Sequence, residues 1–287
     1  MKRLLVTGAS GFLGSRIVEF YKDKFEIFAP THAELDITDE KDVLAKFEEW
    51  NPDYVIHCAA ISAVARCEQE PDMSWKINVE GSIHIAKASA KIHAKCIICS
   101  SDQIYFGSTE NGPHKETECV LPYNVYGREK LKAEEACLAI DADCVLLRLS
   151  WMYDRKTLYK QEHSDFMRML LDKMRTEEVL LYPVHDIRGI TDVNEVVENL
   201  EKMFTVPGGV YNFGSPNKNN TYDTVYEVFS ELGLDTQRLQ RNEDAFMNNP
   251  RDISMCQQKL NACGIYFSTT KDAMLRNIKE GLSSNDE

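Results

Sequence analysis

The chain has 287 residues and is strongly acidic, with 33 basic against 46 acidic side chains and a formal net charge of −13. This length suits one large α/β domain, or a nucleotide-binding domain with a smaller second lobe. The negative charge opposes binding to nucleic acid or to an anionic membrane surface, and no apolar stretch approaches membrane-spanning length. Because only a short apolar run follows Met1, too short for a secretion signal, we expect a cytoplasmic protein.

The first half of the chain alternates short apolar strands with amphipathic helices. This alternation predicts a doubly wound parallel sheet of the Rossmann type, with helices on both faces. The predicted strands cover 3–6, 25–29, 54–58, 95–99 and 144–149, and the predicted helices cover 12–22, 39–50, 73–91 and 124–140.

The first strand leads directly into TGASGFLG at residues 7–14, in which Gly8, Gly11 and Gly14 are spaced three apart. Gly8 permits a tight turn, Gly11 lets the backbone approach a pyrophosphate, and Gly14 lets the next helix pack closely. The amides at the start of that helix favour a phosphate charge. The pattern therefore predicts a dinucleotide site, and the alternative is a turn that only links strand to helix.

The pattern loosens after about residue 150, which indicates a smaller second lobe. Helices are predicted at 164–175, 192–204, 221–233 and 270–280, strands at 179–182 and 209–213, and polar loops at 213–220 and 241–252. We expect a cofactor-binding domain at 1–150 with a returning segment at about 183–205, and a substrate-binding lobe at 151–182 and 206–287.

Nine cysteines are scattered along the chain, an odd number that favours reduced thiols over a disulfide framework. Cys96 and Cys99 form a C-x-x-C spacing inside a predicted strand. Residues three apart on a strand face opposite sides of the sheet. We therefore expect no redox or metal role for this motif and no metal site.

Tyr126 and Lys130 lie four residues apart in the helix that follows the fourth strand, so they share one helix face. The spacing alone is a weak signal, but this position lets a side chain reach the crevice beyond the strand ends. An ammonium there would lower the pKa of the phenol and tune it for proton transfer. Ser101 leaves the fourth strand at the same edge and could hydrogen-bond a carbonyl; the alternative is a serine that caps a loop.

Together these residues resemble the extended short-chain dehydrogenase/reductase family, which also accounts for Ala59-Ala60 after the third strand and for Asn78. Within that family the sequence is similar to the dTDP-4-dehydrorhamnose reductases. The similarity is carried by LDITD (35–39), HCAAISAVARCEQEPDMSWKINVEG (57–81), SSDQIYFG (100–107), YNVYGREKLKAEE (123–135) and RLSWMYD (148–154).

The resemblance implies hydride transfer from a reduced nicotinamide to a keto carbon of a nucleotide-linked sugar. Tyr126 would protonate the oxygen, Ser101 would polarise it, and Lys130 would complete the catalytic set and bind the nicotinamide ribose. The resemblance implies substrate contacts from Ser101, Asp102, Trp151 and Arg251. It implies cofactor contacts from Gly8, Ser10, Gly11, Phe12, Leu13, Gly14, Asp36, Ile37, Ala59, Ala60, Asn78, Ser100, Tyr126 and Lys130.

Three departures from the family pattern concern the substrate. Gln103 stands where the family usually has a tyrosine, Asp165-Phe166 replaces Asn-Phe, and Pro250-Arg251 reverses the usual Arg-Pro order. Arg251 could pair with a pyrophosphate, and the alternative is an ordinary loop arginine.

The second predicted strand is followed by Pro30, Thr31 and His32, with no carboxylate to repel a 2′-phosphate, which favours NADP and leaves NAD open. Two other functions stay open at this point. One is an NAD-dependent sugar-nucleotide epimerase or dehydratase, and the other is a non-catalytic regulatory subunit resembling that of methionine adenosyltransferase. A homodimer is the default expectation for a soluble enzyme of this kind.

Overall fold

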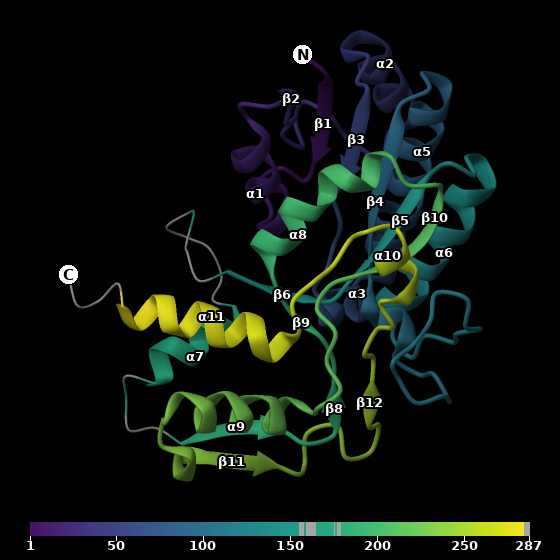
Figure 1. Cartoon of the computed structure of the whole chain (residues 1–287). Coiled ribbons are helices and arrows are strands. Elements are labelled where there is room, and N and C mark those ends of the chain that lie inside the picture. The colour runs from purple at the N-terminus through teal and green to yellow at the C-terminus, as the bar shows by residue number, and fades with distance from the viewer. Residues whose placement is uncertain (155–157, 159–164, 175, 177–178, 284–287) are drawn as a thin grey trace. The chain divides into compact units, whose positions relative to one another are not determined.

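The computed structural model describes residues 1–154, 158, 165–174, 176 and 179–283, which form two compact units (Figure 1). Unit 1 comprises Met1–Gly107, Cys119–Leu149 and Val197–Tyr211. Unit 2 comprises Ser108–Glu118, Ser150–Val196 and Asn212–Glu287.

Unit 1 is built on the predicted parallel sheet. Its strands are β1 (Arg3–Thr7), β2 (Glu26–Phe28), β3 (Tyr54–His57), β4 (Lys95–Ser101), β5 (Val145–Leu149) and β10 (Gly209–Phe213). In the described part of the chain these six strands lie in the order β10-β5-β4-β3-β1-β2. β1 pairs in parallel with β2 and β3, β3 with β4, and β4 with β5. All the carboxyl ends of these paired strands therefore meet at one edge.

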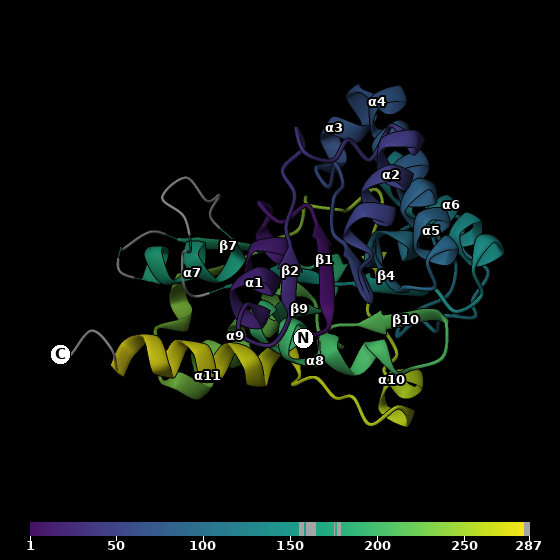
Figure 2. The same cartoon turned by 90° about the horizontal axis from the view of Figure 1, so that it is seen from above.

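The helices between these strands cover both faces of the sheet (Figure 2). They are α1 (Phe12–Tyr21), α2 (Glu40–Trp50), α5 (Ser82–Lys91) and α6 (Val125–Ile140). Because parallel crossovers are right-handed, the step from β1 out to β2 leaves α1 on one face, and the steps from β2 through β5 leave α2, α5 and α6 on the other.

Every second side chain of each strand faces the core under α2, α5 and α6. Leu5, Val55, Ile98 and Leu146 come from four neighbouring strands and pack with Phe47 of α2. Each is at most 2% exposed, and full burial of such a side chain contributes about 1.5–3 kcal/mol. Since the intervening residues are also buried, each strand reads as a continuous apolar run.

The structure corrects the helix predicted over 73–91. The chain instead forms α3 (Val64–Gln69), α4 (Pro71–Trp75) and a π-helical turn over Lys76–Gly81 before α5 begins. Pro71 starts α4 because its missing N–H is not needed in the first turn of a helix. The wide turn occurs where Asn78 is fully buried, and such π-turns are frequent at functional sites.

Unit 2 consists of short strand pairs and helices. The pairs are β6–β9, β7–β11 and β8–β12. A cluster that includes Tyr153, Phe166, Phe229 and Met274 forms its core. Its elements are β6 (Trp151–Tyr153), α7 (Phe166–Met174), β7 (Leu180–Pro183), β8 (Asp186–Ile187), β9 (Ile190–Asp192), α9 (Thr221–Leu232), β11 (Leu239–Asn242), β12 (Arg251–Asp252), α10 (Gln258–Ala262) and α11 (Thr270–Ser283). The helix α8 (Val193–Leu200) begins in unit 2 and ends in unit 1.

The division into units differs from the predicted boundaries in three places. The segment that returns to unit 1 is Val197–Tyr211 rather than 183–205, and Ser108–Glu118 belongs to unit 2. The strand predicted in the second lobe at 209–213 is instead an edge strand of the main sheet, where the Gly209 N–H donates to the Cys144 carbonyl at 2.8 Å. Local pattern identifies a strand but not the sheet that it joins.

Two further differences concern unit 2. β12 lies at the end of the predicted polar loop 241–252, and the ends of the helix predicted at 164–175 fall outside the described residues. Among the residues that the structure describes, no helix has both the length and the apolar character needed to cross a membrane.

Candidate functional site

The glycine turn after β1 is held by close backbone contacts. Gly8 has φ +66°, and a Cβ at this position would lie 2.6 Å from the Ala59 nitrogen. A Cβ on Gly14 would collide with the Gly8 carbonyl, and the Gly11 N–H donates to that carbonyl at 2.9 Å. The predicted tight turn at Gly8 and close helix packing at Gly14 are therefore present. The contact of Gly11 with a pyrophosphate stays a prediction.

The first turn of α1 presents its backbone amides at this turn. Gly11 precedes the helix without a side-chain cap, and the first turn carries no acidic residue. Ser10 is exposed, Leu13 is buried in the core, and the Arg16 guanidinium lies 3.9 Å from the centroid of the Phe12 ring. Uncapped amides with a nearby cation suit an anionic group.

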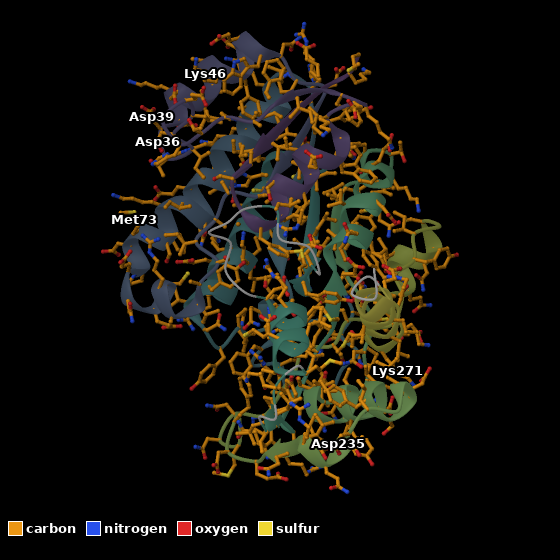
Figure 3. All side chains as sticks on the ribbon, turned by 90° about the vertical axis from the view of Figure 1, so that its left-hand side faces the viewer. Asp36, Asp39, Lys46, Met73, Asp235 and Lys271 are labelled. Carbon is orange, nitrogen blue, oxygen red and sulfur yellow. The ribbon has the colours of Figure 1, made fainter. Side chains whose placement is uncertain are left out.

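The LDITD segment forms a loop that is fixed by Asp36. One Asp36 carboxylate oxygen accepts the Thr38 N–H at 2.9 Å and the Thr38 hydroxyl at 2.7 Å, and these bonds lower the pKa of the carboxyl group. Figure 3 shows Asp36 and Asp39 close together at the surface. Ile37 is buried and faces Gly81, where an added Cβ would lie 2.8 Å from its Cδ1.

The loop after β3 contains Ala59 and Ala60, both half-buried, and it is tied to the π-turn by Asn78. The Asn78 amide accepts the Ile61 N–H at 2.9 Å and donates to the Ile61 carbonyl at 3.0 Å. It also donates to a carboxylate oxygen of Glu129 at 2.7 Å. In this unit, Asn78 therefore shapes the loop through its own hydrogen bonds.

The three predicted catalytic residues come together at the carboxyl edge of β4. Ser101 ends the strand, and Tyr126 and Lys130 lie in the first turns of α6. The Lys130 ammonium donates to the Cys99 carbonyl at 2.8 Å and lies 5.7 Å from the centroid of the Tyr126 ring. All three are buried, with 3–8% of their surface exposed. The sequence therefore identified residues that the fold places side by side.

Asn124 fixes the start of α6 and hence the place of Tyr126. Its side-chain oxygen accepts the Gly127 N–H at 2.7 Å, and its amide nitrogen donates to the Gln103 side chain at 3.0 Å. Gln103, one of the departures from the family pattern, thus supports the catalytic helix. Ser101 also has the alternative role considered from sequence, because its hydroxyl accepts the Gln103 N–H at 3.2 Å and caps the short 3-10 helix that follows.

The pKa of Tyr126 is raised, whereas the sequence led us to expect that it would be lowered. Burial raises it well above the usual value for tyrosine, and a hydrogen bond with Ser101 lowers it only in part. Burial also lowers the pKa of Lys130. The expectation considered the ammonium but not the loss of water around the phenol, and desolvation is the larger effect here. A phenol with a raised pKa stays protonated at neutral pH, as a general acid must.

Ser100, a predicted cofactor contact, donates to the Glu134 carboxylate at 2.5 Å. That carboxylate also binds the Arg148 guanidinium, with an N–O distance of 2.7 Å, and both side chains are less than 5% exposed. Arg148 donates in turn to the Tyr105 hydroxyl at 2.8 Å. This buried network joins β4, β5 and α6 next to the predicted catalytic residues.

His57 forms a second buried network beneath the glycine turn. Its ring nitrogens lie 2.7 Å from the Thr7 hydroxyl and 3.2 Å from the Ser82 hydroxyl, and Ser82 donates to the Asn78 carbonyl. Burial and the Lys130 charge lower the pKa of His57 to about 3. The ring is therefore neutral at ordinary pH, and its hydrogen bonds link β1, β3 and α5.

The predicted substrate contacts are divided between the two units. Asp102 is buried in unit 1, directly after Ser101. In unit 2, Trp151 packs against Phe166 and lies 5.2 Å from the Arg188 guanidinium. The Arg251 guanidinium, also in unit 2, makes two hydrogen bonds to the Asp186 carboxylate, at 2.6 and 3.0 Å.

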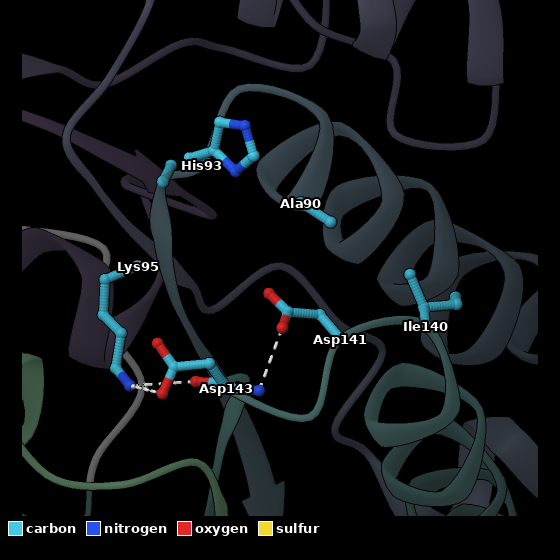
Figure 4. Close-up of a pocket in the computed structure, with 7 residues that line it drawn as sticks. Ala90, His93, Lys95, Ile140, Asp141 and Asp143 are labelled. Carbon is cyan, nitrogen blue, oxygen red and sulfur yellow. Dashed lines mark hydrogen bonds and ion pairs between the residues drawn. The ribbon is translucent and has the colours of Figure 1, made fainter.

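A hollow of about 280 Å³ lies in unit 1 at the amino ends of β4 and β5, the end of the sheet opposite to Ser101 and Asp102 (Figure 4). His93, Lys95 and Asp143 line it, and the Lys95 ammonium is held by the Asp143 carboxylate at 2.6 Å. Ligands of open α/β sheets bind at the carboxyl ends of the strands, which excludes this hollow as the main site. The described residues include no cluster of three or more metal-ligating side chains.

Sequence reasoning missed His57, Asn124, Glu129 and the Glu134–Arg148 pair. Glu129 lies between Tyr126 and Lys130 in α6, is 2% exposed and accepts hydrogen bonds from Ser74 and Asn78. Asn124 carried a usable signal, because asparagine before an amphipathic run is a favoured N-cap. The others form pairs across the fold that local spacing does not show.

The family model described as "RmlD substrate binding domain" matches residues 1–276. The chain belongs to this family. Its curated relatives include "Spore coat polysaccharide biosynthesis protein SpsK" of Bacillus subtilis, which is 27% identical over all of both chains. They also include dTDP-4-dehydrorhamnose reductase of Aggregatibacter actinomycetemcomitans, 28% identical over 80% of this chain and 79% of the relative. The predicted family resemblance is thereby confirmed.

A different class of protein is also related. Methionine adenosyltransferase 2 subunit beta of Pongo abelii is 26% identical over 92% of this chain and 83% of its own. Among solved structures, dTDP-4-dehydrorhamnose reductase from Bacillus anthracis in complex with NADP has a TM-score of 0.83 at 23% identity, covering 98% of this chain and 99% of that chain. The structural likeness confirms the Rossmann-type fold.

Proposed function

We propose that the chain is an NAD(P)H-dependent reductase of a keto group on a nucleotide-linked sugar, like the dTDP-4-dehydrorhamnose reductases among its relatives. The observation that carries the proposal is the grouping of Ser101, Tyr126 and Lys130 at the carboxyl edge of the sheet that also carries the glycine turn. A dinucleotide site without these residues would only bind; with them it has a proton donor and a buried cation.

The glycine turn suits a dinucleotide. A side chain at Gly8 would strike the Ala59 backbone, and the uncapped amides of α1 face an anion without competition from a first-turn carboxylate. These amides would hold the pyrophosphate, and the Asp36 loop would lie by the adenine. When bound, the reduced nicotinamide supplies the hydride for the keto carbon.

The chain's own residues handle the proton. The raised pKa of Tyr126 keeps its phenol protonated until the substrate oxygen gains charge. Ser101, hydrogen-bonded to Tyr126, is placed to donate to the same oxygen. Lys130, anchored on the Cys99 carbonyl, offers its positive charge beside the phenol, which stabilises the phenolate left after proton transfer.

Cofactor choice, the roles of the two units, localisation and oligomeric state complete the proposal. The absence of an acidic residue at Pro30, Thr31 and His32 supports NADP over NAD. We assign cofactor binding to unit 1, and we assign the reading of the sugar nucleotide to unit 2 with Trp151 as a contact; the ion pair of Arg251 with Asp186 supports a structural role for that arginine. Nine free cysteines support a reducing, cytoplasmic setting. A homodimer remains the default expectation.

The decisive experiment incubates the protein with NADPH or NADH and a dTDP-4-keto-6-deoxy sugar. A reductase consumes one cofactor for each hydroxyl product, followed by absorbance and product chromatography. An epimerase or dehydratase converts its sugar nucleotide with no net cofactor consumption, and that result would contradict the proposal. Comparing the two cofactors at equal concentration decides between NADP and NAD.

The relation to methionine adenosyltransferase 2 subunit beta supports one other candidate, a binding protein that acts on a synthetase. That function predicts copurification with the synthetase, a change in its activity, and no turnover of keto-sugar nucleotides. Retention of the complete Ser101, Tyr126 and Lys130 grouping favours the enzyme, because a purely regulatory subunit has no need of a buried lysine beside a buried phenol.

A further inference from the structure

β4 carries two thiols that point to opposite faces of the sheet. Cys96 belongs to the core under α2, α5 and α6, where it hydrogen-bonds Cys144. Cys99 turns to the other face, where its Sγ lies 3.6 Å from the Sγ of Cys58. Cys96 and Cys99 therefore cannot form a disulfide with each other, as expected from their spacing on a strand. Each thiol instead meets a cysteine from the neighbouring strand.

The backbone allows a bond between Cys58 and Cys99. The register of β3 on β4 pairs His57 with Ile98, so the next residues along each chain also face each other. Adjacent strands lie about 4.8 Å apart. This spacing falls within the range of about 4.4–6.8 Å between the Cα atoms of disulfides. Side-chain rotation together with a small shift of the two strand ends is then enough to bring the sulfurs together.

The two thiols differ in a way that suits stepwise oxidation. The hydrogen bond between the two thiols and the nearby Lys130 charge lower the pKa of Cys99, whereas the same hydrogen bond and burial raise the pKa of Cys58. A thiolate is the form that reacts with oxidants. Cys58 is half-buried, whereas Cys96 and Cys144 are at most 1% exposed, so the Cys58–Cys99 pair is the more accessible one.

We propose that Cys58 and Cys99 form a site of oxidative modification, at which a hydroperoxide converts the two thiols into an intramolecular disulfide. The Cys99 thiolate attacks the peroxide oxygen, the O–O bond breaks, and a sulfenic acid and an alkoxide or hydroxide form. Cys58 sulfur then attacks the Cys99 sulfur and displaces water. In sum, two thiols and one hydrogen peroxide give one disulfide and two waters.

The bond would act on the candidate active site through the backbone. The Cys99 carbonyl is the acceptor for Lys130, and Cys58 immediately precedes Ala59, whose backbone lies against Gly8. Drawing the two sulfurs from 3.6 Å to about 2 Å shifts both strand ends at the edge where Ser101 and the glycine turn lie. We therefore expect oxidation to lower the reductase activity, a consequence that rests on the proposed function.

The first test needs no activity. The full-length native protein is treated with hydrogen peroxide, its free thiols are blocked with an alkylating reagent under denaturing conditions, and the digest is mapped by mass spectrometry. We expect a peptide cross-linked through Cys58 and Cys99. The exposed Cys119 and Cys263 report in the same sample that oxidant was present. Full alkylation of Cys58 and Cys99 after those two have reacted, or a Cys96–Cys144 cross-link in their place, would overturn the proposal.

Two cysteine variants then test which pair of thiols forms the cross-link and whether that cross-link lowers turnover. Cys58→Ser should abolish the cross-link and protect turnover, whereas the matched control Cys144→Ser, from the buried pair, should leave the cross-link intact. In the wild type we expect about a tenfold loss of turnover that a dithiol reverses, the size of effect that misplacing one catalytic group produces. Cross-linked protein with unchanged turnover would refute the coupling to the active site. A protein inactive before any treatment would instead contradict the proposed function and leave the mapping result valid.

Discussion

Two cations, the buried Lys130 in unit 1 and the partly buried Arg251 in unit 2, were both expected to bind ligand, and their surroundings differ. Lys130 donates to the neutral Cys99 carbonyl, so its charge is still available to a neighbouring phenol or ribose. The Arg251 guanidinium is held by both oxygens of the Asp186 carboxylate and lies 4.1 Å from the centroid of the Phe246 ring. The pair carries no net charge to offer a phosphate. Burial of a cation alone therefore does not indicate that it binds a ligand. The charge of the group that already binds the cation does.

The largest effect should come from Tyr126→Phe at the Lys130 site. Removing the phenol oxygen removes the proposed proton donor, and we expect turnover to fall by roughly 10²–10⁴-fold. The ring remains in its cluster with Ile61 and Cys67, so cofactor binding and thermal unfolding should be unchanged. Tyr123→Phe, three residues earlier and 58% exposed, is the matched control and should keep full turnover. Normal turnover of Tyr126→Phe would show that the catalytic assignment is wrong.

Glu134→Ala removes the carboxylate that pairs with the buried Arg148 guanidinium. Arg148, which is 4% exposed at its side chain, would keep its charge without the partner that offsets it. We expect the free energy of unfolding to fall by about 3–5 kcal/mol, measured by chemical denaturation.

The exposed pair of Lys91 and Glu48 provides the control. Its N–O distance is 2.6 Å, but both side chains are more than half exposed. Glu48→Ala should cost about 0–1 kcal/mol because water screens the charges. Equal losses in the Glu134 and Glu48 variants would mean that the buried network contributes no more than a surface ion pair.

Arg251→Ala tests whether the arginine of unit 2 stabilises Asp186 or binds the substrate. If the guanidinium mainly serves Asp186, its removal leaves a carboxylate that is 4% exposed, and the free energy of unfolding should fall by about 1–3 kcal/mol. The KM for the sugar nucleotide should then change little. Arg241→Ala, in which an exposed arginine loses Glu243, is the control for stability. A large rise in KM with unchanged stability would instead make Arg251 a substrate contact.

The smallest effect near neutral pH comes from His57, and it grows as the solution becomes more acidic. Its pKa is about 3 in the folded protein, against about 6.5 in an unfolded chain. Between these values only the unfolded chain binds the proton, so stability falls as the pH drops below about 6.5. The loss is about 1.4 kcal/mol for each pH unit. His57→Asn should show a shallower acid dependence in denaturant titrations; an unchanged dependence would mean that other groups cause it.

Most of unit 1 was predictable because its signals are local. The strand lengths, the glycine turn and the Tyr126–Lys130 spacing each lie within a few consecutive residues. The parallel sheet then places their polar ends at one edge, which is why Ser101 lies beside Tyr126 as the sequence predicts. The exceptions depend on distant partners. The interruption of the helix predicted at 73–91 surrounds Asn78, whose hydrogen bonds go to Ile61 and Glu129.

Unit 2 was harder to predict because its strands are short and pair with segments far away in the sequence. β12 has two residues, and its partner β8 lies more than sixty positions earlier. A strand of this length has no measurable alternation. The role of Arg251 depended on Asp186 in the same way, since no local pattern links the two.

By itself the sequence determined the fold class and predicted the dinucleotide turn, because both follow from residue type and short spacing, and its resemblance to a reductase family predicted the catalytic residues. Only the tertiary structure decided the protonation of two groups at that site, the buried phenol that keeps its proton and the neutral His57. The reason is physical. A pKa depends on the loss of water and on charges that come near only when the chain has folded.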